Sequence, residues 1–261
     1  MTKGAIYPTQ KFCSERTRSL LRRGGVALAL AVTASLTAPA LANPPTPHPV
    51  QTKHGPVQGF AKNGVMEFLG IPYAAPPVGN LRWMPPVEHA SWSNVLQATA
   101  YGPTCAQITT LGVFAGPANN NADCLFLNIF TPVINRGNAF GSERRRPVFV
   151  WIHGGGNVDG ESNDYDGSKL AAQGNIVVVT FNYRLGLLGF FAHPAIDAEG
   201  HLFGNYGILD QQMVLKWVRD NIAQFGGDPG NVTVGGQSAG SVDTESNVPD
   251  QAKRPNRRDR G

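Results

Sequence analysis

One short stretch of the chain carries the residues that nucleophilic catalysis needs. Residues 236–240 read Gly-Gln-Ser-Ala-Gly and follow a β-branched run at 232–234. Gly-x-Ser-x-Gly after a strand forms a sharp strand-to-helix turn that exposes the serine hydroxyl, and its glycines avoid steric clashes with their neighbours. This pattern also occurs by chance in glycine-rich turns. The preceding strand and the small Ala239 nevertheless favour Ser238 as a nucleophile.

A second stretch could stabilise the negative charge that develops when a serine attacks a carbonyl. Residues 153–156 read His-Gly-Gly-Gly and come directly after an apolar run. Backbone N–H groups of such a loop can converge on an oxyanion. We therefore expect Gly155 and Gly156, together with Ala239, to form an oxyanion hole. A dinucleotide-binding turn is disfavoured because that motif must open an apolar helix, whereas residues 157–162 are polar and turn-forming.

The base that would activate the serine is not apparent. In enzymes with this motif, an acid and a histidine follow the serine in chain order. Only 23 residues follow Ser238, and none is a histidine. His153, Asp210 and Ser238 occur in the order of a chymotrypsin triad, but that arrangement belongs to a double β-barrel, which these strands do not predict. We assign His153 to holding the glycine loop and expect this chain to lack the triad acid and histidine.

Apolar patterns indicate how these motifs are positioned. The runs at 148–152, 176–179 and 232–234 are short and rich in β-branched residues, which is typical of parallel strands covered on both faces. Apolar residues recur at helical spacing from 207 to 225, and Gly226 then ends the helix. The order strand, helix, strand and serine turn predicts an α/β layout with a mainly parallel sheet.

The N-terminal half shows signals of antiparallel structure. An Asn-Gly pair at 63–64 separates the runs 57–59 and 65–68, which predicts a β-hairpin. Residues 125–130 predict a further strand that ends at a Thr-Pro pair. The proline-rich stretch 71–86 predicts an ordered surface loop without regular structure.

The first 42 residues have the features of an export signal. Six basic residues precede an apolar run at 26–36, and a small-residue site ends at Ala42. The apolar run is shorter than the roughly 20 residues that span a bilayer. Cleavage near Ala42 and a secreted or periplasmic location are therefore favoured over a retained membrane anchor, and we expect no stable membrane insertion.

The charge distribution gives no reason to expect nucleic acid binding. The chain of 261 residues has a formal net charge of +4, of which residues 1–42 contribute +5 and residues 245–261 contribute +2, so residues 43–244 carry about −3. The basic excess therefore belongs to the two ends of the chain, and the central part is mildly acidic.

Three cysteines are present, and Cys13 lies in the expected export signal. In an oxidising compartment Cys105 and Cys124 would then pair, closing a loop of about 19 residues, which is worth about 3 kcal/mol in the loop-entropy model. A metal site is disfavoured because such sites need closer cysteine spacing and more ligands.

Taken together, these motifs resemble the type-B carboxylesterase/lipase family, which includes cholinesterases and fungal lipases. The similarity runs from about Thr52 to Thr244. The stretches that carry it include Phe-Leu-Gly-Ile-Pro-Tyr-Ala at 68–74, Asp-Cys-Leu-Phe-Leu-Asn-Ile at 123–129, Asn-Tyr-Arg-Leu-Gly at 182–186, Gly-Asn-Tyr-Gly at 204–207 and the long signature at 225–240.

The resemblance implies an α/β-hydrolase fold and hydrolysis of small-molecule carboxylic esters through an acyl-enzyme on Ser238, without a metal or an organic cofactor. It also implies the disulfide between Cys105 and Cys124 and a chain much longer than this one. At position 237, where many members have glutamate, this chain has glutamine. The oxyanion donors implied by the resemblance are Gly155, Gly156 and Ala239.

The similarity to the family ends near Thr244. Residues 245–261 contain few apolar residues and the helix-breaking Pro249, and their last part has a composition typical of disorder. We therefore expect the N-terminal part of a carboxylesterase domain at 43–244, with its sheet truncated after the serine turn. Residues 245–261 would be a disordered, non-family tail, as a frameshift or a mispredicted gene end would produce.

Three interpretations of the function stay open. The chain is an incomplete carboxylesterase, a non-catalytic binding protein like the adhesion molecules among cholinesterase relatives, or a fragment that works with a separately encoded C-terminal half. The presence of both Ser238 and the glycine loop speaks against the binding protein, because binding needs neither.

Overall fold

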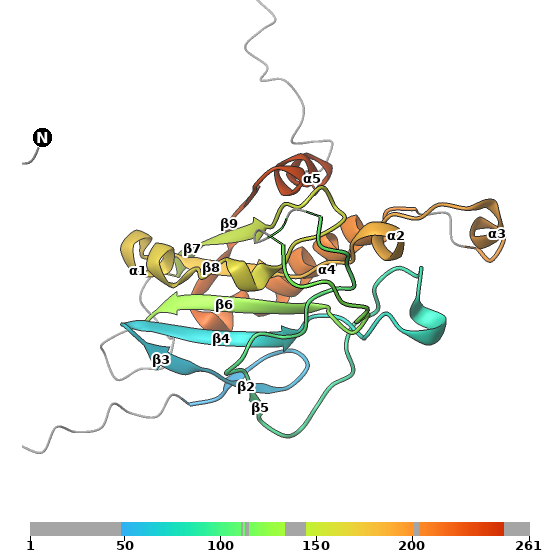
Figure 1. Ribbon diagram of the computed structural model, residues 1–261. Coiled ribbons are helices and arrows are strands. Elements are labelled where there is room, and N and C mark those ends of the chain that lie inside the picture. Colours follow the sequence, from blue (N-terminus) through green and yellow to red (C-terminus); the bar gives the residue numbers. More distant parts are fainter. Residues whose placement is uncertain (1–47, 111, 113–114, 134–144, 201–203, 248–261) are drawn as a thin grey trace, which may run out of the picture. The chain divides into compact units, whose positions relative to one another are not determined.

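The computed structural model describes residues 48–110, 112, 115–133, 145–200 and 204–247 (Figure 1). The expected export signal at 1–42 lies outside the described residues, as do residues 248–261 of the expected tail.

The central element is a six-stranded sheet with the strand order β3-β4-β6-β8-β7-β9. Strands β8 and β9 both pair in parallel with β7, as predicted for these three runs. All other neighbours, from β3 to β8, pair antiparallel. The strands span, in sheet order, Phe60–Lys62, Val65–Pro72, Phe126–Pro132, Val177–Phe181, Arg146–Ile152 and Gly227–Gly236.

The prediction of a mainly parallel sheet is therefore wrong for the described part of the chain, where the sheet is mixed. The reason lies in the connections. Strands β3 and β4 are joined by a tight turn, which allows only antiparallel pairing, whereas β8 and β9 are separated by the helix α4 (Tyr206–Asn221), a crossover of the kind that parallel strands need.

The predicted hairpin forms at the Asn-Gly pair, but its first strand is β3 and not residues 57–59. Asn63 and Gly64 have φ values of 51° and 80°, as a two-residue hairpin turn of type I′ requires. Such a turn makes its flanking residues direct partners, so Lys62 pairs with Val65 and the first strand must adjoin the turn.

Residues 56–58 instead belong to a separate small sheet. This three-stranded sheet has the order β1-β2-β5, with β1 and β2 antiparallel and β2 and β5 parallel. Its strands are Val50–Gln51, Pro56–Gln58 and Leu96–Gln97.

Helices cover both faces of the large sheet (Figure 1). Helix α1 (Ser168–Gly174) packs on one face against β4, β6 and β8, whereas α4 lies on the other face, where α5 (Ala239–Asn247) packs against α4, β7 and β9. The predicted helix at 207–225 is confirmed as α4 and the 3-10 turn that follows it. The short elements are α2 (Gly186–Gly189), α3 (Pro194–Asp197), η1 (Gly79–Leu81), η3 (Ser162–Asp164) and η4 (Ile222–Phe225).

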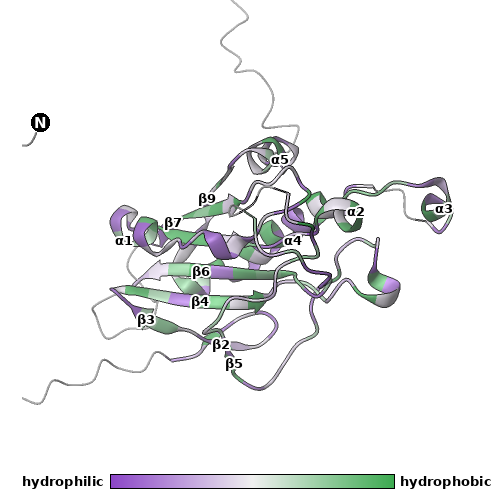
Figure 2. Cartoon of the chain, viewed as in Figure 1, coloured by the Kyte–Doolittle hydropathy of each residue, from purple (hydrophilic) through white to green (hydrophobic). Residues whose placement is uncertain are grey.

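Strand β8 shows how the sheet buries both faces. Its residues alternate between the faces: Val177 and Val179 join the main hydrophobic core, which contains Trp217 of α4, whereas Val178 joins a smaller cluster with Ala171 of α1. Figure 2 shows hydrophobic stretches on the strands of the sheet, interrupted by hydrophilic residues.

Strand β9 lies at the edge of the sheet, paired with β7 alone among the described residues. Its Thr233 is exposed, and Val232 and Val234 are only half-buried. The expectation that this run is covered on both faces is therefore wrong for the described part of the chain. Helices α4 and α5 pack against β9 on one face, whereas α1, on the other face, packs against β4, β6 and β8. Strands with a free edge can pair with a further segment.

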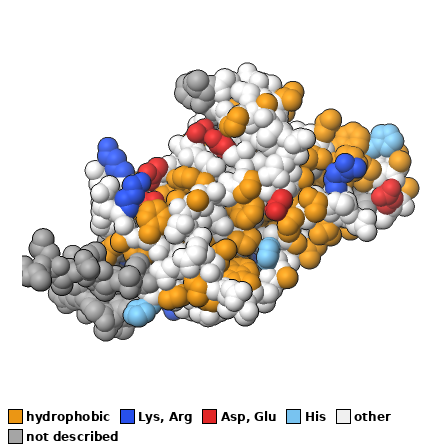
Figure 3. All heavy atoms as spheres, turned by 60° about the horizontal axis from the view of Figure 1, so that its bottom comes forward, with side chains coloured by type: hydrophobic (Ala, Val, Ile, Leu, Met, Phe, Trp, Pro, Cys, Tyr) orange, Lys and Arg blue, Asp and Glu red, His pale blue; other side chains and the backbone are white. Residues whose placement is uncertain are grey.

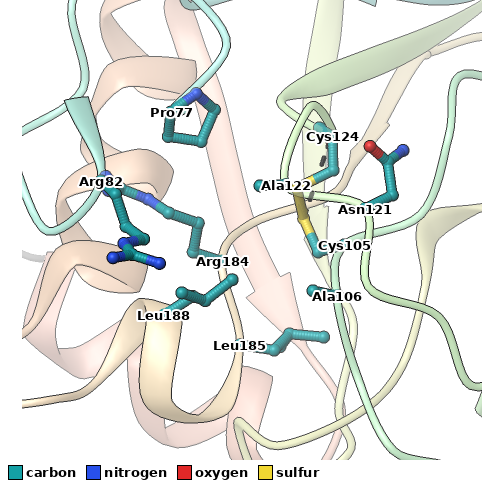
Figure 4. A pocket seen from close by; sticks show the side chains of 10 residues that line it. All are labelled: Pro77, Arg82, Cys105, Ala106, Asn121, Ala122, Cys124, Arg184, Leu185 and Leu188. Carbon is teal, nitrogen blue, oxygen red and sulfur yellow. Dashed lines mark hydrogen bonds between the residues drawn. A yellow bond between two sulfur atoms is a disulfide. The ribbon is translucent and has the colours of Figure 1, made fainter. Parts of the chain in front are cut away.

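The predicted disulfide between Cys105 and Cys124 is present, with its Cα atoms 4.9 Å apart. It fastens the long loop before β6 to the start of that strand. Together with Arg82 and Arg184 it lines a pocket, shown in Figure 4, which contains no residue of the glycine loop or the serine turn.

A buried ion pair joins the segment after β8 to helix α4. The Arg184 guanidinium donates to both oxygens of Asp210 at 2.7 and 2.8 Å, and its third nitrogen donates to the Met84 carbonyl at 2.9 Å. The two side chains are 3% and 0% exposed. Burial raises the pKa of Asp210, and the neighbouring guanidinium opposes this rise.

Removing one partner of this pair should destabilise the fold strongly, because it leaves a buried, uncompensated charge. We expect Asp210→Ala to lower the free energy of unfolding by about 3–5 kcal/mol, measured by urea denaturation. Arg219→Ala removes an exposed ion pair with Asp220, in which Arg219 is 67% exposed, and should cost less than about 0.5 kcal/mol. Equal effects of the two variants would contradict a stabilising role of the buried pair.

Candidate active site

Ser238 lies in the sharp turn between β9 and α5. Its φ of 56° is in the left-handed region, which residues other than glycine rarely adopt. The side chain is exposed, and its hydroxyl has no hydrogen-bond partner within the part of the chain that the structure describes. A serine held in this way presents its oxygen to a ligand approaching from solvent.

The two glycines that flank this turn are required by close backbone contacts. A Cβ atom at Gly236 would overlap the carbonyl of Gly240, and a Cβ atom at Gly240 would overlap the carbonyl of Ile152. The steric reason predicted for the Gly-x-Ser-x-Gly pattern is thereby confirmed. The absence of these side chains lets the start of α5 rest on the end of β7.

The glycine loop at 153–156 follows β7 and lies against the serine turn. A Cβ atom at Gly154 would be 2.6 Å from the carbonyl oxygen of Gln237 and 3.1 Å from Cβ of Ser238. The two motifs meet because β7 and β9 are parallel neighbours. The carboxyl ends of both strands therefore lie side by side at the same end of the sheet.

The loop itself is a tight turn with left-handed backbone. Gly155 and Gly156 have φ values of 111° and 62°, and the N–H groups of Val158 and Asp159 donate to the Gly155 carbonyl at 3.0 and 3.1 Å. A Cβ atom at Gly155 would overlap the Asp159 carbonyl. Only glycine therefore fits at this position.

Three N–H groups of the glycine loop and the serine turn donate no hydrogen bond within the described part of the chain. Among the hydrogen bonds that the described residues form with one another, none has the backbone N–H of Gly155, Gly156 or Ala239 as its donor. Ala239 is also the first residue of α5, at the end of the helix that carries a partial positive charge. These groups can donate hydrogen bonds to an anionic oxygen.

His153 is buried at the base of the loop, 1% exposed, and does not hydrogen-bond to Ser238. Its Nδ1 lies 2.8 Å from the Gly154 carbonyl, which can only accept, so Nδ1 carries the proton. The ring stacks on Tyr183 with 4.4 Å between the ring centroids. Burial lowers the pKa of His153 to about 4. It is a neutral residue that supports the loop, as predicted.

The structure does not assemble the triad order His153, Asp210 and Ser238. The Asp210 carboxylate is occupied by Arg184, and His153 bonds to its own loop. None of the hydrogen bonds made by histidines within the described ranges reaches Ser238.

The disulfide-bonded loop supports the glycine loop from outside, which the sequence reasoning missed. The Gln107 amide accepts from the N–H of Gly160 at 2.7 Å and donates to its carbonyl at 3.3 Å. The Thr110 N–H donates to the buried Asp159 carboxylate at 2.7 Å. No signal in the sequence predicts these contacts, because the partners are about 50 residues apart and join only through the fold.

The low pKa of His153 gives a testable pH dependence. Between about pH 6.5 and 4 the unfolded chain binds a proton that the folded chain excludes, so stability falls as the pH falls, by up to about 1.4 kcal/mol per pH unit from this residue. We expect the NMR shifts of the His153 ring to report a neutral imidazole down to about pH 4. In the urea-unfolded chain it should titrate near 6.5. A folded-state titration near 6.5 would contradict the buried geometry.

The left-handed backbone at Ser238 should appear as strain. We expect Ser238→Gly to be more stable than Ser238→Ala by about 1 kcal/mol, since only glycine adopts this conformation without cost. At Ser241, inside α5, the order should reverse and alanine should be better by about 0.5–1 kcal/mol. Thermal unfolding of the four variants measures both differences, and the same order at both positions would show that the turn is not strained.

Comparison with known proteins agrees with these features. Liver carboxylesterase 1 of Oryctolagus cuniculus is 46% identical over 233 residues, which cover 82% of this chain and 39% of that protein. Para-nitrobenzyl esterase of Bacillus subtilis is 48% identical over 198 residues, 74% of this chain and 38% of that protein. This chain therefore spans about 40% of the length of such relatives.

Solved structures agree with this result. A thermophilic pNB esterase superimposes with a TM-score of 0.68 at 46% identity, over 75% of this chain and 40% of that one, which confirms the α/β-hydrolase fold. The model of the carboxylesterase family matches residues 46–253. The chain belongs to the carboxylesterase family.

Proposed function

We propose that this chain supplies the nucleophile and the oxyanion hole for the hydrolysis of carboxylic esters. The observation that carries the proposal is the contact between the glycine loop and the serine turn, through Gly154 and Ser238. The exposed Ser238 hydroxyl, and the N–H groups of Gly155, Gly156 and Ala239, which donate no hydrogen bond among the described residues, support the proposal.

In the proposed reaction, the Ser238 oxygen attacks the ester carbonyl and its proton passes to a base. The carbonyl oxygen becomes negative in the tetrahedral intermediate, and the three N–H groups stabilise it. The alcohol then leaves with a proton, and water hydrolyses the acyl-enzyme in the same manner. Removing one oxyanion donor typically costs about 2.7–4 kcal/mol of transition-state stabilisation.

The base has to come from outside the described residues, since no histidine among them hydrogen-bonds to Ser238. A further part of a longer chain, or a separately encoded C-terminal half, would supply the histidine and its acid. A metal ion is not part of the proposed chemistry. Within the described residues no group of three or more His, Cys, Asp or Glu is placed to hold one.

The substrates proposed here are small-molecule carboxylic esters. Two similar proteins bear names that describe what they act on: the para-nitrobenzyl esterase of Bacillus subtilis and a medium-chain fatty acyl-CoA hydrolase precursor of Anas platyrhynchos, which is 42% identical over 238 residues.

Figure 3 shows separate groups of hydrophobic side chains and scattered Lys and Arg side chains on the face that it displays.

We further propose that the chain is exported after cleavage near Ala42. The disulfide between Cys105 and Cys124 supports this proposal, because such bonds persist in oxidising compartments. Among the residues that the structure describes, none of the helices has the length and apolar character needed to cross a bilayer.

The domain boundary near Thr244 is also a proposal. Residues 245–247, in the expected tail, form the last turn of α5, and the family match continues to residue 253. The expectation that disorder begins at residue 245 is therefore wrong for residues 245–247.

A fluorophosphonate probe tests the proposed nucleophile. We expect the purified chain to be labelled at Ser238, as mapped by mass spectrometry, and Ser238→Ala to abolish the labelling. Ser241→Ala is the matched control on the first turn of α5 and should keep it. Labelling of another residue, or equal labelling of Ser238→Ala, would contradict the assignment.

Adding imidazole tests the missing base. Imidazole should accelerate the labelling of Ser238 about tenfold or more, since a general base contributes 10²–10⁴-fold when it is positioned. Labelling that is already fast and does not respond to imidazole would show that the chain contains its own base.

A further inference from the structure

A buried carboxylate connects the helix of the nucleophile to the glycine loop. Asp243 lies on α5, five positions after Ser238, and is 4% exposed. One of its oxygens accepts from Nδ2 of Asn157 at 3.1 Å, and the other accepts from Nε2 of Gln211 on α4 at 2.7 Å. Within the described residues no Lys or Arg forms an ion pair with it.

Asn157 is the residue that directly follows the glycines of the loop. It adopts left-handed backbone with φ 60°. Its Oδ1 accepts from the Tyr183 hydroxyl at 3.1 Å, and its carbonyl accepts from the N–H of Gly186 at 2.7 Å. Both groups of its side-chain amide are therefore used, and Asp243 holds the donor end.

The other end of the loop is held by the same network. The Tyr183 hydroxyl also lies 2.9 Å from the carbonyl of His153, which precedes the glycines. Tyr183 is buried, and burial together with the nearby Asp243 charge raises its pKa, so it stays a neutral donor. The glycines 154–156 thus lie between His153, which is held by Tyr183, and Asn157, which is held by Tyr183 and Asp243.

Docking of α5 alone does not require the contact with Asn157. Asn247, in the last turn of α5, donates to Oε1 of Gln211 at 2.7 Å and so binds the helix to α4 independently. A buried carboxylate without a cation is costly unless its hydrogen bonds are made. The Asp243 oxygen that accepts from Asn157 therefore has a separate role, which is directed at the loop.

We propose that Asp243 is a positioning residue that fixes the glycine loop relative to the serine turn. This inference rests on the proposed function, since it explains how the donors of Gly155 and Gly156 are kept beside Ser238. The carboxylate acts through Asn157 and Gln211 and does not touch the substrate.

An exchange of the two side-chain types tests the hydrogen bond directly. Asp243→Asn leaves one acceptor oxygen for two amide donors, those of Asn157 and Gln211. Asn157→Asp brings two carboxylates together. Each single change therefore breaks a contact of the network. In the double variant the new amide at position 243 donates to the new carboxylate at position 157, whose second oxygen still accepts from Tyr183. The double variant should therefore restore what each single change loses.

Two measurements distinguish an effect of Asp243 on the position of the loop from an effect on the stability of the whole fold. Hydrogen exchange of the amides at 153–160, followed by mass spectrometry, should become about tenfold to a hundredfold faster in each single variant, and should return to the original rate in the double variant. The rate constant of phosphonylation of Ser238 should fall by a similar factor with little change in probe affinity. Thr244→Val, which removes only a bond within α5 to the Gly240 carbonyl, should change neither.

The outcomes separate the two proposals. If the unaltered chain is not labelled at all, the proposed function fails, and hydrogen exchange still decides whether Asp243 fixes the loop. Unchanged exchange at 153–160 in folded Asp243→Asn, or a double variant as fast as the single ones, would overturn the positioning role. Circular dichroism shows whether each variant is folded.

Discussion

The close backbone contact between the end of β7 and the turn after β9 is the constraint on which the site depends. Because the two strands are parallel neighbours, the chain continues from both of them at the same end of the sheet. Gly154, Gly236 and Gly240 carry no side chain, and each is positioned where a Cβ atom would overlap the backbone or side chain of the facing segment. The glycine loop and the serine turn are thus in contact before any substrate is present.

The backbone at this contact is strained, and buried polar side chains hold it in place. Ser238 and Asn157 both adopt left-handed backbone without being glycine, and such residues persist only where the surroundings fix them. The buried partners differ in kind: a neutral imidazole at His153, a carboxylate at Asp243, and the amide of Gln107, which binds both backbone groups of Gly160. His153 bonds within the loop itself, whereas Asp243 attaches α5, and Gln107 attaches the disulfide-bonded loop, to the residues that follow the glycines.

The sequence predicted those parts of the fold that depend on local pattern and sterics. The three parallel strands, the helix α4 and the requirement for glycine around Ser238 follow from hydrophobic runs and from backbone geometry. The mixed sheet and the half-exposed β9 could not be predicted in this way, because strand order depends on pairing between distant segments. Asp243 was missed for the same reason. As a polar residue shortly after a motif it resembles a surface position, and only the fold places Asn157 and Gln211 against it.

In the proposed reaction, the two tasks of a serine hydrolase fall to different parts of the structure. The electrostatic part, which usually supplies the largest contribution to catalysis, needs only N–H groups at the ends of β7 and β9 and the start of α5, and these segments fix one another. The proton-transfer part needs a base that reaches Ser238 from the open side, where its hydroxyl is exposed and unpaired among the described residues. Because the segments that carry the N–H groups fix one another, the group of oxyanion donors can form before a base is supplied. Among the described strands β9 pairs with β7 alone, and its other edge is where a further segment could pair.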